Sequence, residues 1–231
     1  VTQSDTPCWR LLTRIDPQTL NLVKFFKPHG RQLYASLNDG RLIAVGDNLW
    51  DRLGVGHGRE VKTFKEIKPL RGESIKSIVC GRGHTMVLTE DGQVWGWGRN
   101  EDGQVGVGDR EEQLLPKLIL DKDIVQVKCG DVYTLALKND GKVMGWGSNW
   151  DGKLGIDNTV DQPTPVPSRL PEDVIIDQIE VGTAHSIAVS RDGRVYGWGW
   201  NVFYQLGLGH NNNVRLPAHI DVHSKTIKSV A

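Results

Sequence analysis

Short apolar stretches recur along the chain about every 50 residues, each followed by an Asp-Gly pair and a second apolar stretch. The four pairs are Asp39-Gly40, Asp91-Gly92, Asp140-Gly141 and Asp192-Gly193, spaced 52, 49 and 52 residues apart. In three copies the preceding stretch occupies residues 85–89, 134–138 and 186–190, and the following one residues 93–98, 142–147 and 194–199. Two β-rich runs joined by Asp-Gly predict a hairpin with a type I′ turn, because that turn requires positive φ at both central residues.

The same period carries two further strand patterns. Another apolar run ending in glycine precedes three of the hairpins, at residues 75–81, 124–130 and 175–182. After each hairpin comes a loop that begins with an asparagine (Asn48, Asn100, Asn149, Asn201), followed by a segment that contains proline (Pro69, Pro116, Pro163 and Pro165, Pro217). Because proline is confined to the edges of sheets, the last segment is expected to be an outer edge strand or its approach.

Four strands in each period of about 50 residues predict an all-β fold in which small antiparallel sheets pack side by side as the blades of a β-propeller. We expect residues 30–231 to form a partial propeller of four repeats and the start of a fifth. The first repeat, around residues 33–46, is degenerate. Residues 1–29 are expected to be a lead-in with a short helix, because Asp16-Pro17 suits an N-cap followed by the first helical position.

Composition and charge exclude several classes of protein. Lys plus Arg (28) equals Asp plus Glu (28), so the basic excess typical of a non-specific nucleic-acid binder is missing and direct nucleic-acid binding is not supported. No apolar run approaches the roughly 18 residues of a membrane span. Three cysteines (Cys8, Cys80, Cys129) are too few for a disulfide framework, which favours an intracellular location, cytoplasmic or nuclear.

The joint motifs resemble those of the regulator-of-chromosome-condensation repeat family. They are Cys80-Gly-x-x-His-Thr85, then Asp91-Gly92, Trp97-Gly98-Arg99-Asn100 and the glycine-rich run 103–108, and the resemblance covers about residues 30–231. It implies a seven-bladed propeller, of which this chain would hold about four blades. The final residues, 227–231, match 75–79, so the chain stops within a repeat and is expected to be a fragment of a longer protein. The lead-in also resembles that of animal proteins in which such a propeller is followed by BTB domains.

The resemblance leaves three functions open. The first is a non-enzymatic scaffold that holds a protein partner. The second is guanine-nucleotide exchange on a small GTPase, for which no wedge-like hairpin is evident between these evenly spaced repeats. The third is a histone-binding regulator, which the zero net charge does not support. A ubiquitin-ligase component is another candidate partner. Photoreception, as in plant ultraviolet-B receptors of this fold, is disfavoured because their Gly-Trp-Arg-His-Thr signature is not reproduced at residues 81–85, 130–134 or 182–186.

Most residues that could take part in catalysis or metal binding occupy repeat positions. His84 and His185 share one position, which Tyr133 and Gln32 take in the other copies, so the rings lie in different blades and are interpreted as bonding within their own blade. Cys80 and Cys129 share another position, are interpreted as small buried apolar residues, and form no Cys-x-x-Cys pair. We therefore expect no metal, no cofactor and no catalytic site. The remaining structural positions are Gly81, Gly130, Gly182, the three later Asp-Gly pairs, Trp97-Gly98, Trp146-Gly147 and Trp198-Gly199.

The loops that follow the asparagines vary most between copies. Aromatic residues at Trp50, Trp150, Trp200, Phe203 and Tyr204 contrast with the polar Glu101-Asp102-Gly103 of the second copy. Function on a repeated scaffold usually lies in such variable loops, and aromatic residues are enriched at interfaces. These residues are the candidate partner-binding loops; the alternative is that their rings fold over neighbouring blades.

Overall fold

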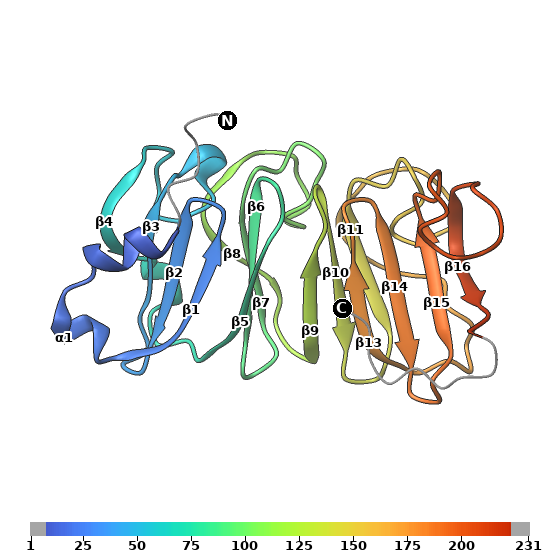
Figure 1. Cartoon of the computed structure of the whole chain (residues 1–231), viewed down its shortest axis with the longest axis horizontal. Coiled ribbons are helices and arrows are strands. Elements are labelled where there is room, and N and C mark those ends of the chain that lie inside the picture. Colours follow the sequence, from blue (N-terminus) through green and yellow to red (C-terminus); the bar gives the residue numbers. More distant parts are fainter. Residues whose placement is uncertain (1–7, 223–231) are drawn as a thin grey trace.

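The computed structural model describes residues 8–222 and consists of four antiparallel four-stranded sheets that stand side by side (Figure 1). Each sheet is one blade. Blade 1 comprises β1 (Val23–His29), β2 (Gln32–Leu37), β3 (Leu42–Gly46) and β4 (Val61–Glu66); blade 2 comprises β5 (Ile75–Cys80), β6 (His84–Thr89), β7 (Val94–Gly98) and β8 (Gln113–Leu120). Blade 3 comprises β9 (Ile124–Cys129), β10 (Tyr133–Lys138), β11 (Val143–Gly147) and β12 (Gln162–Pro167); blade 4 comprises β13 (Ile176–Val181), β14 (His185–Ser190), β15 (Val195–Gly199) and β16 (Val214–Ile220). The predicted all-β architecture of propeller blades is confirmed.

The first blade begins earlier than the sequence indicated. Helix α1 (Pro17–Leu20) follows η1 (Cys8–Arg14), and the Asp16 carboxylate caps α1 by accepting the Thr19 N–H at 2.9 Å. Strand β1 then pairs with β2, so the segment assigned to the lead-in supplies the inner strand of blade 1. The sequence concealed this strand because β1 runs into a short turn at Gly30 instead of the Cys-Gly or Val-Gly ending of its counterparts. The predicted start of a fifth repeat lies outside the described residues.

The Asp-Gly hairpins are present, but their turn type differs from the prediction. Gly92 has φ +81°, whereas Asp91 does not enter the left-handed region. The Gly92 N–H donates to Thr89 O at 3.1 Å and the Thr89 N–H donates to Gln93 O at 3.0 Å. This is a three-residue loop in which a type I turn is followed by a left-handed glycine, so the type I′ prediction is wrong. Glycine alone supplies the positive φ, and the aspartate instead accepts backbone hydrogen bonds, as Asp140 does from the Lys142 N–H at 3.1 Å.

The first strand of each blade lies innermost and the fourth lies at the rim. Strand β9 contacts both β5 and β13, whereas β8, β12 and β16 each end their sheet. These outer strands contain the prolines expected at edges (Pro116, Pro163, Pro165, Pro217), while Pro69 lies in η3 (Lys68–Leu70) just after β4. A proline in an outer strand costs no ladder bond where its missing N–H would point away from the sheet, because that side of the strand has no partner strand.

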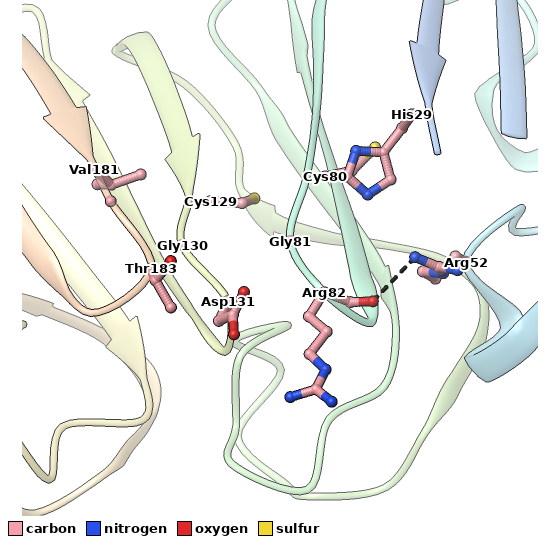
Figure 2. Close-up of a pocket in the computed structure, with 11 residues that line it drawn as sticks. His29, Arg52, Cys80, Gly81, Arg82, Cys129, Gly130, Asp131, Val181 and Thr183 are labelled. Atoms are coloured by element: carbon pink, nitrogen blue, oxygen red, sulfur yellow. Dashed lines mark hydrogen bonds between the residues drawn. The ribbon is translucent and has the colours of Figure 1, made fainter. Parts of the chain in front are cut away.

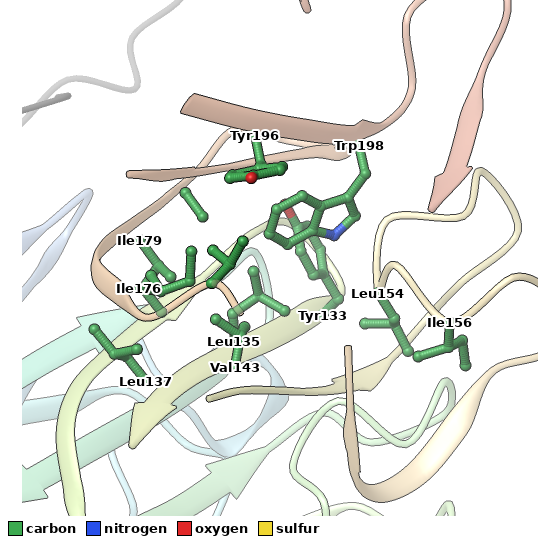
Figure 3. Packing of buried hydrophobic residues seen from close by; sticks show 12 residues of the cluster. Tyr133, Leu135, Leu137, Val143, Leu154, Ile156, Ile176, Ile179, Tyr196 and Trp198 are labelled. Carbon is green, nitrogen blue, oxygen red and sulfur yellow. The ribbon is translucent and has the colours of Figure 1, made fainter. Parts of the chain in front are cut away.

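The core lies between the faces of neighbouring blades. Figure 3 shows the contact between blades 3 and 4, where Tyr133 and Leu135 of β10 meet Trp198 of β15 and Ile179 of β13. Equivalent clusters join blade 1 to blade 2 and blade 2 to blade 3. An isolated blade would leave its apolar faces in solvent, so each blade depends on its neighbours to bury them.

Candidate functional site

One buried asparagine organises the loop between the third and fourth strands of every blade. In blade 3, Asn149 Oδ1 accepts the Leu154 N–H at 3.0 Å, and Asn149 Nδ2 donates to Asn158 O at 2.9 Å. Asn48, Asn100 and Asn201 accept and donate at the same offsets. A single amide thus satisfies two backbone groups that the irregular loop would otherwise leave without partners. The loops share this anchor while their exposed residues differ.

These loops lie at the same end of the blades as the turns that join the first and second strands. The Arg99 N–H donates to Gly83 O at 2.9 Å, and Ser148 and Trp200 repeat this bond to Val132 and Ala184. The two sets of segments form what we call the loop face: residues 81–83, 130–132 and 182–184, with residues 47–57, 99–109, 148–158 and 200–210. The Asp-Gly turns lie at the opposite end of the hairpins.

The residue directly after each asparagine is exposed in all four blades. Leu49 is 53% exposed, Trp150 62% and Val202 45%, and the fourth, Glu101, is also exposed. Three of the four are therefore apolar side chains in contact with solvent. Leu49 and Trp150 remain exposed although the next blade is in place beside each of them. The sequence interpretation missed Leu49 and Val202; alignment of the four loops on their asparagines would have found both.

The five predicted loop residues fall into two groups. Trp150, Phe203 (73%) and Tyr204 (58%) are exposed, whereas Trp50 and Trp200 are half-buried. Trp200 packs edge-to-face against Phe203, with ring centroids 5.2 Å apart. The centroid of the Trp50 ring lies 5.6 Å from the Arg52 guanidinium and 5.5 Å from that of Arg99, which belongs to blade 2. Trp50 thus folds over the next blade, which is the alternative that the sequence left open for this group.

Tyr204 adopts a backbone conformation that a bulky side chain rarely takes. Its φ is +59°, and the same loop position holds Gly103 (φ +78°) in blade 2 and Gly152 (φ +80°) in blade 3. A left-handed conformation costs a non-glycine residue roughly 1 kcal/mol or more. Because the ring is mostly exposed, its packing within the described residues offsets little of that cost.

Lys153 and Asp151 form a buried ion pair beneath Trp150. Lys153 Nζ lies 3.1 Å from Asp151 Oδ2 and 4.9 Å from the centroid of the Trp150 ring, and both charged residues are almost fully buried. Burial raises the pKa of the Asp151 carboxyl and lowers the pKa of the Lys153 amine, while their mutual attraction opposes both shifts. Blades 2 and 4 have glutamines here, and each glutamine accepts a backbone N–H within its own loop. Blade 3 therefore has a charged support under its exposed tryptophan.

The repeated tryptophans connect consecutive blades. Trp97 Nε1 donates to Arg52 O at 2.5 Å, and Trp198 Nε1 donates to Lys153 O at 2.8 Å, in each case from one blade to the loop of the blade before it. Both rings are fully buried, as is that of Trp146, which packs at the same position but whose Nε1 makes no hydrogen bond. A Cβ at Gly54 would lie 2.8 Å from the Trp97 ring, so glycine is required at that point of the loop. These tryptophans hold the loops in place and are not accessible to a partner.

His84 bonds across blades, which corrects the prediction that it bonds within its own blade. Its Nε2 lies 3.0 Å from Thr134 Oγ1 in blade 3, and the Thr134 hydroxyl donates to Gln104 O at 3.0 Å. Nε2 therefore carries the proton, and Nδ1 is buried without a partner. Burial lowers the pKa of His84 to about 3, because a second ring proton would have no acceptor. His185 is half-buried, and desolvation lowers its pKa as well.

The ends of the inner strands surround a central pocket of about 450 Å³ (Figure 2). Its lining contains Cys80 and Cys129 with His29, Arg52, Arg82 and Asp131, and the glycines Gly81, Gly130 and Gly182. Both cysteines are half-buried as whole residues, and they pack against the apolar clusters between the blades. Desolvation raises the pKa of Cys80 to about 11, so this thiol is a poor nucleophile at neutral pH.

Backbone hydrogen bonds link the rim of this pocket from blade to blade. The Arg82 N–H donates to Asp131 O at 2.9 Å, and the Asp131 N–H donates to Thr183 O at 3.2 Å. Within residues 8–222, no group of three or more His, Cys, Asp or Glu side chains is arranged to bind a metal ion. The helices of this same segment are all too short or too polar to cross a membrane.

Comparison with known proteins places the repeat in a family. Residues 29–231 match the family model described as the RCC1-like domain. The chain is 32% identical to the ultraviolet-B receptor UVR8 of Arabidopsis thaliana, over 79% of the chain and 42% of the receptor. It is 31% identical to the human X-linked retinitis pigmentosa GTPase regulator, over 80% of the chain and 13% of that protein. The chain thus spans less than half the length of these relatives.

The solved structure of Prp20p from Saccharomyces cerevisiae has the same fold. It superposes with a TM-score of 0.72 over 86% of this chain and 50% of Prp20p, with 24% of residues identical. The chain belongs to the RCC1-like domain family.

Proposed function

We propose that the loop face is a protein-binding surface and that the chain acts as a non-catalytic interaction scaffold. The observation that carries this proposal is the position after each anchoring asparagine, which is exposed in four blades and apolar in three. An apolar side chain that the fold leaves in solvent at a repeated position gains its contacts when a partner covers it. Trp150 offers the largest such surface, and its ring contacts the buried Lys153 at 4.9 Å.

The proposal is tested by replacing the apolar residues at this position with charged ones. In a triple variant, Leu49→Glu, Trp150→Glu and Val202→Glu place charges where blade 2 already has Glu101. We expect proteins captured by the unmodified chain to be lost from the triple variant while its melting temperature stays within about 3 °C, as for surface substitutions. The matched control is Val125→Glu, which places the same charge at the far end of β9 on another exposed apolar residue. An unchanged set of partners in the triple variant would exclude the loop face as their binding site.

Regulation of a small GTPase is a second candidate. It is favoured by two similar proteins: one is a GTPase regulator, and the other, Prp20p, has reported binding properties to Gsp1p and histones. The central pocket would be the place for such an activity, because it joins the charged side chains of Arg82 and Asp131 at the middle of the loop face. The test is release of a fluorescent guanine nucleotide from a panel of small GTPases. If the chain accelerates nucleotide release and the Arg82→Ala and Asp131→Ala variants do not, this candidate is supported. If the chain accelerates nucleotide release from none of the GTPases, the candidate is contradicted.

A further inference from the structure

A second surface lies on the outer rim, where residues 54–57 at the end of the blade 1 loop approach blade 2. The loop of blade 1 meets the outer strand β8 of blade 2 there, because the Gly56 N–H donates to Leu114 O at 3.1 Å. The two elements and the end of β4 enclose a groove of about 460 Å³. Its lining residues are Gly54, Val55, Gly56, His57, Lys65, Glu66, Lys68, Pro69 and Leu115.

The wall of this groove is apolar. Val55 is half-buried, whereas Pro69 and Leu115 are exposed, Leu115 by 42% of its surface. Gly56 has no side chain to fill the space beside Leu115; a Cβ there would lie 3.4 Å from Leu115 Cδ2. Three apolar residues from three different segments thus converge on one opening that is wide enough for a side chain.

The rim of the groove is positively charged. Lys65 and Lys68 are exposed, and neither makes an ion pair within the described residues. The single carboxylate in the lining, that of Glu66, is held by two hydrogen bonds from the Arg71 guanidinium at 2.6 and 2.7 Å. His57 lies on the same rim. The two lysines are therefore free to meet carboxylates of a partner.

The corresponding groove between blades 2 and 3 keeps part of this lining, with Val107 and Lys117 in the places of Val55 and Lys65, and differs in the rest. The Gly108 N–H donates to Pro163 O at 2.9 Å, as Gly56 does to Leu114, which places Thr164 where blade 2 has Leu115. Asp109 occupies the loop position of His57, as the donation from Asn100 to its carbonyl shows. Of the two copies, only the blade 1–2 groove has Leu115 in its wall and a second lysine, Lys68, on its rim, so the repeat architecture does not require these two residues.

We propose that this groove binds an extended acidic segment of a partner protein, with one apolar side chain of that segment packed against Val55, Pro69 and Leu115. Carboxylates on either side of the apolar residue face Lys65 and Lys68. The apolar wall favours a peptide over a phosphate backbone, because a nucleic acid would pair with the lysines and leave Leu115 uncovered. The groove shares residues 54–57 with the loop face but contains none of the exposed residues that follow the asparagines, so this interaction does not rest on the function proposed for those residues.

Selection of random seven-residue peptides displayed on phage against the full chain tests the proposal without a known partner. We expect enriched peptides to combine one Leu, Ile, Met or Phe with flanking Asp or Glu. An enriched peptide, labelled with fluorescein, is then measured by anisotropy. The double variant K65E/K68E should weaken its binding by about tenfold or more, and raising the salt concentration should weaken binding to the unmodified chain, since the lysine charges are exposed.

Matched variants separate the groove from the rest of the molecule. Leu115→Thr installs the residue that blade 3 already has at this position, and it should also reduce binding. Lys117 is the blade 2 counterpart of Lys65, because it pairs with Gly96 as Lys65 pairs with Ala44 in blade 1. The charge reversal Lys117→Glu should leave peptide binding within about twofold of that of the unmodified chain. Trp150→Glu should leave it unchanged. Absence of an acidic–apolar consensus, binding indifferent to K65E/K68E, or a dT15 oligonucleotide that binds and is lost in the same variants would overturn the proposal.

Discussion

The loops of blades 2 and 3 have the same anchor and present different surfaces. Asn100 and Asn149 make the same pair of backbone contacts, and the glycines three residues later have φ values of +78° and +80°. Yet the exposed residue after the asparagine is Glu101 in one blade and Trp150 in the other. Because the buried amide fixes the loop from within, the exposed side chain beside it can change without changing the fold. The positions at which the exposed residue differs between blades therefore indicate function, whereas the residues shared by all blades indicate the fold.

The largest expected effect contrasts two tryptophans. Trp97 is fully buried and donates to the loop of blade 1, whereas Trp150 is 62% exposed. Trp97→Ala should lower the free energy of unfolding by about 3–5 kcal/mol, because it leaves a large cavity and removes one of the hydrogen bonds to the Arg52 carbonyl. Trp150→Ala should lower it by about 0.5 kcal/mol or less. Denaturant titration of both variants checks this, and equal losses would contradict the division between structural and exposed tryptophans.

The shared anchor predicts equal costs in the two loops. Asn100→Ala and Asn149→Ala should each lower the free energy of unfolding by about 2–3 kcal/mol, because each leaves a buried loop N–H and carbonyl without a partner. The same denaturant titration measures both. A difference of more than about 1 kcal/mol between them would show that the loops are held by different contacts.

The two histidines at one repeat position should differ in their response to acid. The pKa of His84 in the folded chain is about 3, below the ordinary value of 6.5, so the unfolded chain takes up the proton first as the pH falls. Stability from this group is present above pH 6.5 and declines between pH 6.5 and 3, by about 2 kcal/mol at pH 5. The variant His84→Gln, which installs the residue found at the equivalent position Gln32 of blade 1, should remove that decline in stability. His185→Gln should change it less, since His185 is half-buried. Denaturation at pH 5.0 and 7.5 distinguishes them, and identical pH profiles for all three chains would contradict this account.

The smallest expected effect concerns the left-handed loop position. Tyr204→Gly should raise the free energy of unfolding by about 0.5–1 kcal/mol, since glycine adopts φ near +60° without strain. Gly152→Ala should act in the opposite direction, because a Cβ at Gly152 would lie 2.7 Å from Arg215 Cα. Thermal denaturation checks both. A Tyr204→Gly variant that is less stable than the unmodified chain would show that the tyrosine ring packs more than its exposure indicates.

The repeat was predictable from the sequence because the fold requires the same residue type at the same position of every blade. Glycine is needed for positive φ at Gly92, and its spacing therefore marks the hairpins. The turn type was not predictable in the same way, because Asp-Gly suits both a type I′ turn and a type I turn followed by a bulge. Strand β1 was concealed because its turn at Gly30 does not share the motif of the other blades.

The candidate site was only partly predictable because exposure depends on contacts between blades. Trp50 and Trp150 look alike in the sequence, but the Arg52 and Arg99 guanidinium groups cover the first and leave the second in solvent. The bond from His84 to Thr134 joins residues 50 positions apart in neighbouring blades, so no local pattern contains it. The groove beside Leu115 likewise requires three segments that only the packed blades bring together.

One exchange of residues tests the central claim most directly. Trp150→Glu gives the loop of blade 3 the exposed residue of blade 2 and leaves the anchoring Asn149 in place. We predict that partners captured by the unmodified chain, quantified by mass spectrometry, fall by about tenfold or more, while the melting temperature is unchanged within about 2 °C. Undiminished capture by the Trp150→Glu chain, at the same melting temperature, would contradict the claim that the exposed residue beside the asparagine carries the interaction.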